Sequence, residues 1–201
     1  MTERREQRIK NVLKQRKFDV SILLENVHDP HNISAVMRTC DSVGIQEINI
    51  LKTSSSLPYK WSKRTSSSAN KWLTINTYTN LEECMTVLKK KFKTIYTSHL
   101  STENPGISLY ECNFEDSCLF IFGNERLGIS KELMSYSNQN FFIPQIGIIQ
   151  SLNISVACAV TIYEMFRQRE VLKNTSKFQN QNMGNKELEE LYQRFNISTT
   201  K

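Results

Sequence analysis

The chain has 201 residues, of which 39% are hydrophobic and 23% charged, and its formal net charge is +6. This composition is typical of one globular domain with short extensions, and it argues against a fibrous or largely disordered chain. The sequence holds no run of about 18 apolar residues and no apolar segment behind its first residues, so we expect neither a membrane span nor a secretory signal, and a cytoplasmic location.

Strand and helix patterns alternate along the chain. Short apolar runs predict β-strands, in chain order, at 20–24, 48–51, 72–78, 94–98, 117–122 and 140–143. Helical spacing of apolar residues predicts helices at 3–16, 31–43, 79–91, 152–172 and 186–195, and Ser130 can cap a further short helix. Gly44 is placed to end the second helix, and Thr79 with Glu82 has the spacing of a capping box.

Alternation of this kind predicts an α/β fold with a mainly parallel sheet and flanking helices. We expect a basic helical extension over 1–17, the main domain over 18–172, and a polar linker with a short helix over 173–201. Ligands of parallel sheets bind beyond the carboxyl ends of the strands. The loops predicted at that edge are 25–34, 123–130 and 144–153.

The five cysteines make an odd number with neither a Cys-x-x-Cys pair nor a Cys/His cluster. This count and spacing argue against a disulfide framework and a zinc site, and they favour reduced, buried thiols. We expect no metal site.

Positive charge is concentrated at the two ends of the chain. Residues 1–17 carry a net +5 and residues 167–201 a net +3, whereas 18–166 carry about −2. The stretch 52–71 adds five cations and no acid. A nucleic acid that touches both ends and this stretch would explain the pattern, and solvated Lys-rich faces are the alternative.

Several common site motifs are absent or incomplete. Residues 123–130 nearly match a P-loop, but Ile129 stands where the motif needs its lysine. No Gly-x-Gly follows a predicted strand, so a Rossmann dinucleotide site has no support. His28 and His31 lie near Asp29 without a nucleophile elbow, which favours ordinary loop histidines.

Three segments together resemble the motifs of the SPOUT (trefoil-knot) methyltransferases. They are 32–44 (NISAVMRTCDSVG), 119–129 (LFIFGNERLGI) and 143–157 (IPQIGIIQSLNISVA), and the resemblance covers about 18–166. The runs 28–32 and 150–156 are most similar to the branch that methylates the ribose 2′-OH of guanosine 18 in the tRNA D-loop (TrmH type). The resemblance implies a C-terminal trefoil knot, a homodimer, tRNA as partner and S-adenosylmethionine as methyl donor, without a metal.

The resemblance also implies a set of site residues. Positions that match the family's cofactor contacts, which are made largely through backbone groups, are Ser98, Gly123, Ile143, Ile148 and Leu152. Glycine lets a backbone approach a ligand, and apolar side chains can cover an adenine ring, so the residue types suit this role. For Ile143 and Leu152, ordinary core packing is compatible with it.

Arg38 matches the family's catalytic arginine, and the supporting polar positions are Asn32, Glu125, Ser151 and Asn153. Arg38 either takes the hydroxyl proton, which is costly because a guanidinium must first lose its own proton, or orients the ribose and phosphate. For Glu125, simple bracing of a loop is the alternative to a contact with substrate. Without the resemblance, Arg38 would be read as a surface ion-pair partner.

Two other functions stay open at this point. A ribosomal RNA ribose methyltransferase of the same superfamily often has a separate N-terminal RNA-binding domain, and only some 17 residues precede the first strand here. A non-catalytic RNA-binding protein with the same fold is the second. In all three cases RNA contacts are expected from the basic residues Arg4, Arg8, Lys60, Lys63, Arg64 and Arg167.

Overall fold

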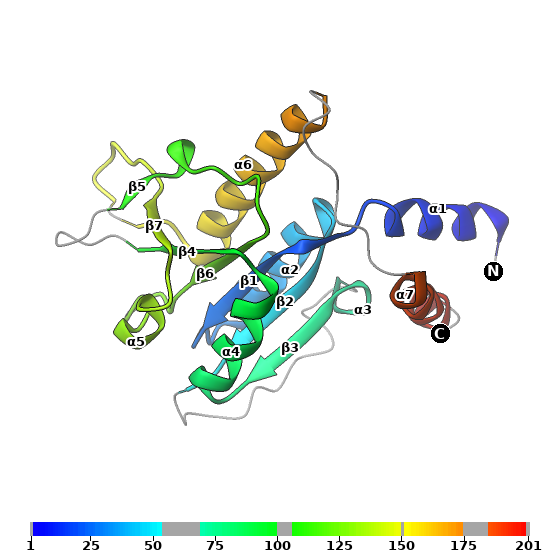
Figure 1. Cartoon of the computed structure of the whole chain (residues 1–201), viewed down its shortest axis with the longest axis horizontal. Helices are drawn as coiled ribbons and strands as arrows, with labels where there is room; N and C mark the ends of the chain where they lie inside the picture. The colour runs from blue at the N-terminus through cyan, green and yellow to red at the C-terminus, as the bar shows by residue number, and fades with distance from the viewer. Residues whose placement is uncertain (1, 54–68, 100–105, 150, 175–184, 200–201) are drawn as a thin grey trace.

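The computed structural model describes residues 2–53, 69–99, 106–149, 151–174 and 185–199. Its centre is a seven-stranded sheet in the order β3-β2-β1-β6-β4-β7-β5, and all neighbouring strands are parallel (Figure 1). The strands are β1 (Lys17–Glu25), β2 (Ile45–Leu51), β3 (Thr74–Tyr78), β4 (Thr94–Ser98), β5 (Ile107–Ser108), β6 (Cys118–Phe122) and β7 (Gln139–Phe142). The predicted α/β fold with a parallel sheet is confirmed, and the trefoil knot stays a prediction.

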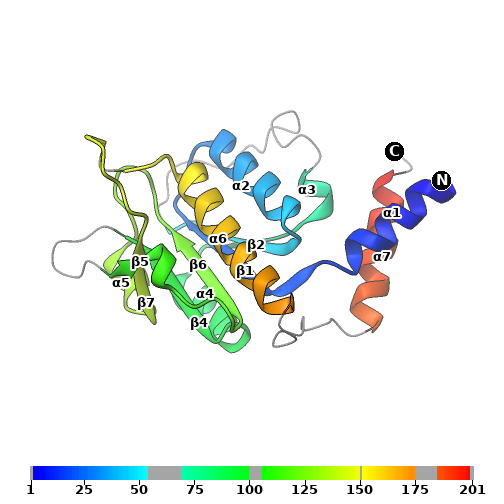
Figure 2. The same ribbon diagram turned by 90° about the horizontal axis from the view of Figure 1, so that it is seen from above.

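Helices cover both faces of the sheet, because side chains along each buried strand alternate between the faces. They are α1 (Glu3–Leu13), α2 (Pro30–Ser42), α3 (Ala69–Trp72), α4 (Leu81–Lys91), α5 (Lys131–Met134), α6 (Ile154–Asn174) and α7 (Asn185–Thr199), with a 3-10 turn η1 (Leu109–Glu111). Figure 2 shows α2 and α6 side by side on one face, where Ile22 and Phe120 point. Leu23 and Leu119 point to the other face and pack against α4 and α5.

Helix starts differ in detail from the sequence prediction. Asn80, and not Thr79, caps α4, since its side chain accepts a hydrogen bond from the Glu83 amide. Ser130 caps α5 as predicted. Helix α6 begins at Ile154 rather than at 152, because Asn153 accepts hydrogen bonds at its N-terminus. Trp72 ends the short α3 and is not part of a strand.

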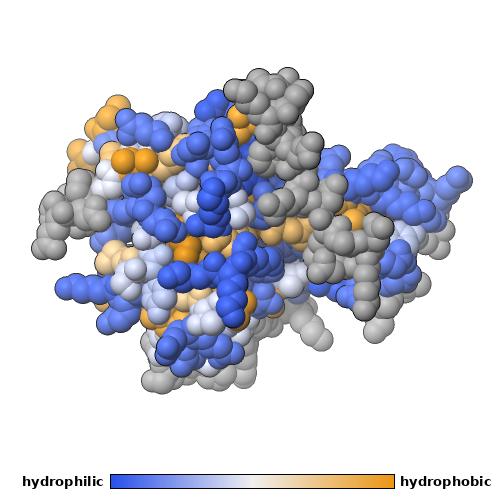
Figure 3. All heavy atoms as spheres, in the orientation of Figure 1, coloured by the Kyte–Doolittle hydropathy of each residue, from blue (hydrophilic) through white to orange (hydrophobic). Residues whose placement is uncertain are grey.

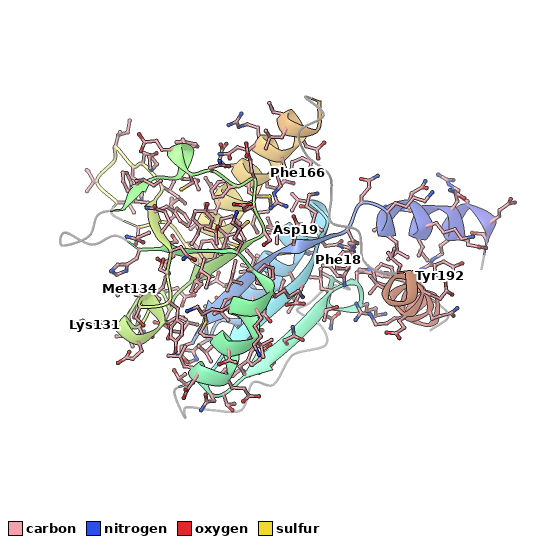
Figure 4. The ribbon with its side chains drawn as sticks, in the orientation of Figure 1. Phe18, Asp19, Lys131, Met134, Phe166 and Tyr192 are labelled. Atoms are coloured by element: carbon pink, nitrogen blue, oxygen red, sulfur yellow. The ribbon has the colours of Figure 1, made fainter. Side chains whose placement is uncertain are left out.

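The two ends of the chain pack against each other at the amino-terminal edge of the sheet (Figures 1 and 2). Ile9 and Leu13 of α1 form a small apolar cluster with Leu191 and Phe195 of α7. Phe18 and Tyr192, labelled in Figure 4, are partly buried against this cluster. The N-terminal extension is therefore a packed helix pair with α7, and not an isolated arm.

A buried ion pair fastens α6 to the centre of the sheet. Arg169 is fully buried and donates to Asp19 Oδ2 at 2.8 Å and to the Phe114 carbonyl at 2.9 Å. It also donates to the Asp116 carbonyl at 2.8 Å. Buried charges need such pairing, so this arginine fixes the carboxyl-terminal half of α6 on β1 and on the segment before β6.

Candidate active site

A cavity of about 430 Å³ lies beyond the carboxyl ends of β4, β6 and β7, where ligands of parallel sheets bind. Its volume is in the range of small-molecule and cofactor sites. The lining combines apolar side chains, glycine backbone and a few polar groups: Ser98, His99, Phe122, Gly123, Asn124, Glu125, Gly128, Phe141, Phe142, Ile143, Gln145, Ser151, Leu152, Asn153, Ile154 and Ala157. Such a lining fits an adenosine-containing cofactor with one charged end.

The loop after β6 folds back on itself beside this cavity. Asn124 and Gly128 exchange backbone hydrogen bonds of 3.0 and 2.8 Å, and the Asn124 side chain accepts from the amides of Arg126 and Leu127. A Cβ atom at Gly123 would lie 2.1 Å from the Gly128 carbonyl carbon, so only glycine permits this turn. At the predicted cofactor position Gly123, the cavity wall is therefore formed by backbone atoms.

The end of β1 holds this loop from the other side. Glu25, which is buried, accepts hydrogen bonds from the Ser130 amide at 2.8 Å and from its hydroxyl at 2.6 Å. Asn26 has a φ of 51° and accepts a 2.8 Å bond at its carbonyl from Asn124. The end of β1 and the loop after β6 therefore meet through hydrogen bonds that span about a hundred residues of chain.

Three of the predicted polar residues form a connected relay. The side-chain nitrogen Nδ2 of Asn32 donates to Glu125 Oε1 at 2.6 Å, and Nδ2 of Asn153 donates to Asn32 Oδ1 at 3.1 Å. Asn153 Oδ1 in turn accepts from the amide and the hydroxyl of Ser155 at 2.8 and 2.6 Å. The relay joins the start of α2, the loop after β6 and the start of α6, one from each motif.

The remaining predicted residues separate into two groups. Ser98, Ile143, Ser151 and Leu152 line the cavity, as expected for a cofactor site and its support. The side chain of Ile148 is fully exposed and is not part of the lining, so the structure does not place this predicted cofactor residue at the cavity. Ile146 and Ile149 of the same loop are exposed too. Apolar atoms are visible at this end of the molecule in Figure 3.

Arg38 is exposed on α2, two helical turns beyond Asn32, and does not line the cavity. Within the part of the chain that the structure describes, it makes no hydrogen bond or ion pair. On a helix Arg38 shares a face with Ser42, whose hydroxyl lies 3.2 Å from the hydroxyl of Tyr163 on α6. Its guanidinium is therefore available for a phosphate or a ribose beside α6.

The predicted RNA contacts have different surroundings. Arg4 and Arg8 are exposed on α1 and line hollows between α1 and the domain, together with Arg5. Arg167 forms a bidentate ion pair with Glu164, with distances of 2.8 and 2.7 Å, which lowers the pKa of that carboxyl. Lys60, Lys63 and Arg64 lie outside the described residues.

Other chemistries find no support in the described part of the chain. All five cysteines are free and buried, and burial raises the pKa of the thiols of Cys84, Cys112 and Cys118 to about 12, so none is a ready nucleophile. No group of His, Cys, Asp or Glu that could hold a metal is found among those residues. No helix among them is long and apolar enough to cross a bilayer.

Sequence reasoning missed His99, which lines the cavity directly after Ser98. The signal was a polar residue immediately behind a predicted strand, at the edge where ligands bind. It also missed Glu25 and Asn26, whose role depends on contacts with a distant loop. Such contacts have no local pattern.

Comparison with known proteins decides the family. Residues 19–163 match the SpoU rRNA Methylase family, which is well over half of the chain. The chain belongs to this family. A tRNA (guanosine(18)-2′-O)-methyltransferase of Thermus thermophilus is 37% identical over 168 residues, covering 84% of both chains.

Solved structures of family members support the same assignment. The Aquifex aeolicus TrmH/SpoU tRNA modifying enzyme superposes with a TM-score of 0.83 and 26% identity, covering 99% of this chain and 98% of that one. The methyltransferase AviRb of Streptomyces viridochromogenes, in complex with AdoMet, has a TM-score of 0.67 and 21% identity, covering 77% of this chain and 59% of that one. The second likeness supports the fold.

Proposed function

We propose that this SpoU family member transfers the methyl group of S-adenosylmethionine to the ribose 2′-OH of guanosine 18 in tRNA. The observation that carries the proposal is the relay of Asn32, Glu125 and Asn153, which joins all three motifs at the edge of a cofactor-sized cavity. The 37% identity to the Thermus enzyme, over most of both chains, supports guanosine 18 of tRNA as the target.

The residues of the cavity suit the cofactor. Gly123 and Gly128 offer backbone to a flat ligand, while Ile143 and Leu152 offer apolar surface for an adenine ring. When bound, S-adenosylmethionine supplies an electrophilic methyl group on a sulfonium, so no metal is required. The Glu125 carboxylate, held by Asn32, favours positive charge in this cavity.

The reaction forms a bond between the ribose 2′-oxygen and the methyl carbon, breaks the bond of that carbon to sulfur, and releases the hydroxyl proton. We assign Arg38 the role of orienting the ribose and its phosphate. Its planar, five-donor guanidinium matches the geometry of a phosphate. The proton then leaves to a substrate phosphate or to solvent.

The position of Arg38 outside the cavity supports a homodimeric enzyme. Helix α6 exposes Val156 and Tyr163 on one face, with exposed fractions of 47 and 51%, and Leu152, just before the helix, is 37% exposed. Arg38 lies one helical turn before Ser42, whose hydroxyl is 3.2 Å from the hydroxyl of Tyr163. A second copy that covers this face would bring Arg38 of one protomer toward the cavity of its partner. Light scattering of the wild type and of Val156→Glu tests this, and a wild-type monomer at micromolar concentration would remove it.

The methyl-transfer experiment uses labelled S-adenosylmethionine with two tRNA transcripts. One carries guanosine at position 18 and the other 2′-deoxyguanosine there. We expect label in the first alone, mapped to that nucleotide, because the second lacks the accepting oxygen. Label in both transcripts would contradict the assignment of the ribose at position 18.

Ribosomal RNA is a second candidate substrate, because the matching family is described by rRNA methylation. Incubation with a 23S rRNA transcript under the same conditions separates the two. We expect the tRNA to be labelled and the rRNA not, whereas the reverse would make the chain an rRNA enzyme. A chain that binds tRNA and labels neither substrate would be a non-catalytic RNA-binding protein.

A further inference from the structure

The cavity has few ionisable side chains in its lining. Among the described residues that line it, only His99 and Glu125 carry ionisable side chains, and none is Lys or Arg. The adjacent segment 100–105, which lies outside the described residues, contains no Lys or Arg in its sequence either. Among the described residues of the lining, His99 is therefore the only one of a basic residue type, and the other polar side chains there are hydroxyls, amides and the Glu125 carboxylate.

The backbone on both sides of His99 is fixed to β7. The His99 amide donates to the Phe141 carbonyl at 3.3 Å, and the His99 carbonyl accepts from the Asn140 side chain at 3.0 Å. These bonds extend the pairing of β4 with β7 by one residue beyond Ser98. The side chain is thus presented from a held backbone and not from a free loop.

The imidazole of His99 lies against the loop after β6. A Cβ atom on Gly128 would be 3.6 Å from His99 Nδ1 and 3.8 Å from Cε1, which is van der Waals distance. Gly128 itself lines the cavity, so the ring is at the wall. Within the described residues the imidazole has no hydrogen-bond partner, although its backbone is fully engaged. A donor at a cavity wall without a protein partner is suited to a ligand.

We propose that His99 binds the carboxylate of the methionine part of the cofactor. This inference rests on the proposed function, which requires S-adenosylmethionine. That molecule carries a sulfonium, an ammonium and one carboxylate. The Glu125 carboxylate suits the two cationic groups and repels the carboxylate. An imidazole N–H supplies the donor that the carboxylate needs in either protonation state of the ring.

The test compares two ligands that differ only in this carboxylate. S-adenosylhomocysteine carries it, and 5′-deoxy-5′-(3-aminopropylthio)adenosine keeps the ammonium and the adenosine but lacks it. Titration calorimetry of the wild type and of His99→Ala measures the affinity for each. Loss of a charge-assisted hydrogen bond corresponds to a decrease of roughly 10- to 100-fold in affinity. We expect this decrease for S-adenosylhomocysteine and less than about twofold for the aminopropyl analogue.

Each other outcome is assigned in advance. An equal loss for both ligands would mean that His99 only braces the cavity, and no loss for either would mean that it does not contact the ligand; both overturn the inference. A wild type that binds neither ligand overturns the proposed function instead. His31→Ala is the matched control, because it removes an exposed imidazole that does not line the cavity, and it should leave both affinities unchanged.

Discussion

Removal of the Asn32 side chain tests whether the relay organises the cofactor cavity. Asn32→Ala deletes the 2.6 Å bond to Glu125 and the 3.1 Å bond from Asn153. A hydrogen bond to a charged group contributes about 1.5–3 kcal/mol and a neutral one about 0.5–1.5 kcal/mol. Because the relay borders an open cavity, water replaces the lost partners. We therefore expect the free energy of unfolding to fall by only about 1–2 kcal/mol.

The larger effect should be on ligand binding. Without Asn32, the loop that carries Glu125 and the start of α6 must be ordered by the ligand itself. If this ordering costs about 1.4 kcal/mol of the binding free energy or more, the affinity for S-adenosylhomocysteine falls at least about tenfold. Calorimetry measures the affinity, and urea unfolding measures the stability. Asn76→Ala is a matched control, because it removes an Asn–Asn hydrogen bond of 3.0 Å within the sheet.

Asn32→Asp gives a second, pH-dependent test. The new carboxylate keeps an acceptor for Asn153 but faces the Glu125 carboxylate at hydrogen-bond distance. Two carboxylates this close cannot both stay ionised cheaply, so one pKa rises. Lowering the pH supplies a shared proton and restores a hydrogen bond, and the binding defect should then shrink. If Asn32→Ala binds like the wild type, or the Asp variant is equally weak at every pH, the relay does not organise the cavity.

Three further predictions concern the reacting ribose, the RNA contacts and the core. Arg38→Ala should lower the rate of methyl transfer at least about a hundredfold in single-turnover assays and leave cofactor affinity unchanged. Arg38→Lys should not restore the rate, because an ammonium lacks the fork geometry of the guanidinium. Near-normal turnover of the Lys variant would refute a specific role of the guanidinium and leave only a general effect of its charge. Arg4→Ser with Arg8→Ser should flatten the salt dependence of tRNA affinity by up to about two units of slope, and an unchanged slope would show that α1 only packs. Arg169→Met should lower the free energy of unfolding by about 3–5 kcal/mol, and adding Asp19→Asn should recover part of it, because the loss comes from an unpaired buried carboxylate.

The regular elements could be predicted because their signals are local. Continuous apolar runs in β1 and β6 reflect a sheet that is covered on both faces, and the apolar positions of α2 mark its buried side. The motif residues Asn32, Glu125 and Asn153 were also expected at one site, and the structure joins them. β5 was not predicted, because its two residues pair with β7 and leave no periodic pattern.

What the sequence could not indicate depends on contacts between distant residues. Arg169 reads as part of a basic helix end, yet it is fully buried against Asp19, which lies 150 positions earlier. Ile148 was expected at the cofactor, and its side chain is exposed. The path of the loop backbone places it there, and its apolar character alone does not indicate that path. Residues 1–17 were expected as a basic helical extension, and their packing against Leu191 and Phe195 of α7 was not foreseen.

The loops at the carboxyl edge of the sheet are held together by hydrogen bonds between them. They contribute few charged or polar side chains that could bind a ligand directly. Four contacts hold the loops together, all between segments of different motifs or strands: Glu25 with Ser130, Asn26 with Asn124, Asn32 with Glu125, and Asn153 with Asn32. Each contact removes loop freedom during folding, so that less ordering is left for the ligand to supply. The walls of the cavity are largely backbone and apolar surface, so few single side chains in them make specific contacts with a ligand. Ligand affinity then depends on the hydrogen bonds that keep these walls in position. The asparagines and Glu25, several of them outside the lining, should therefore govern cofactor affinity more than Ile143 or Leu152 do.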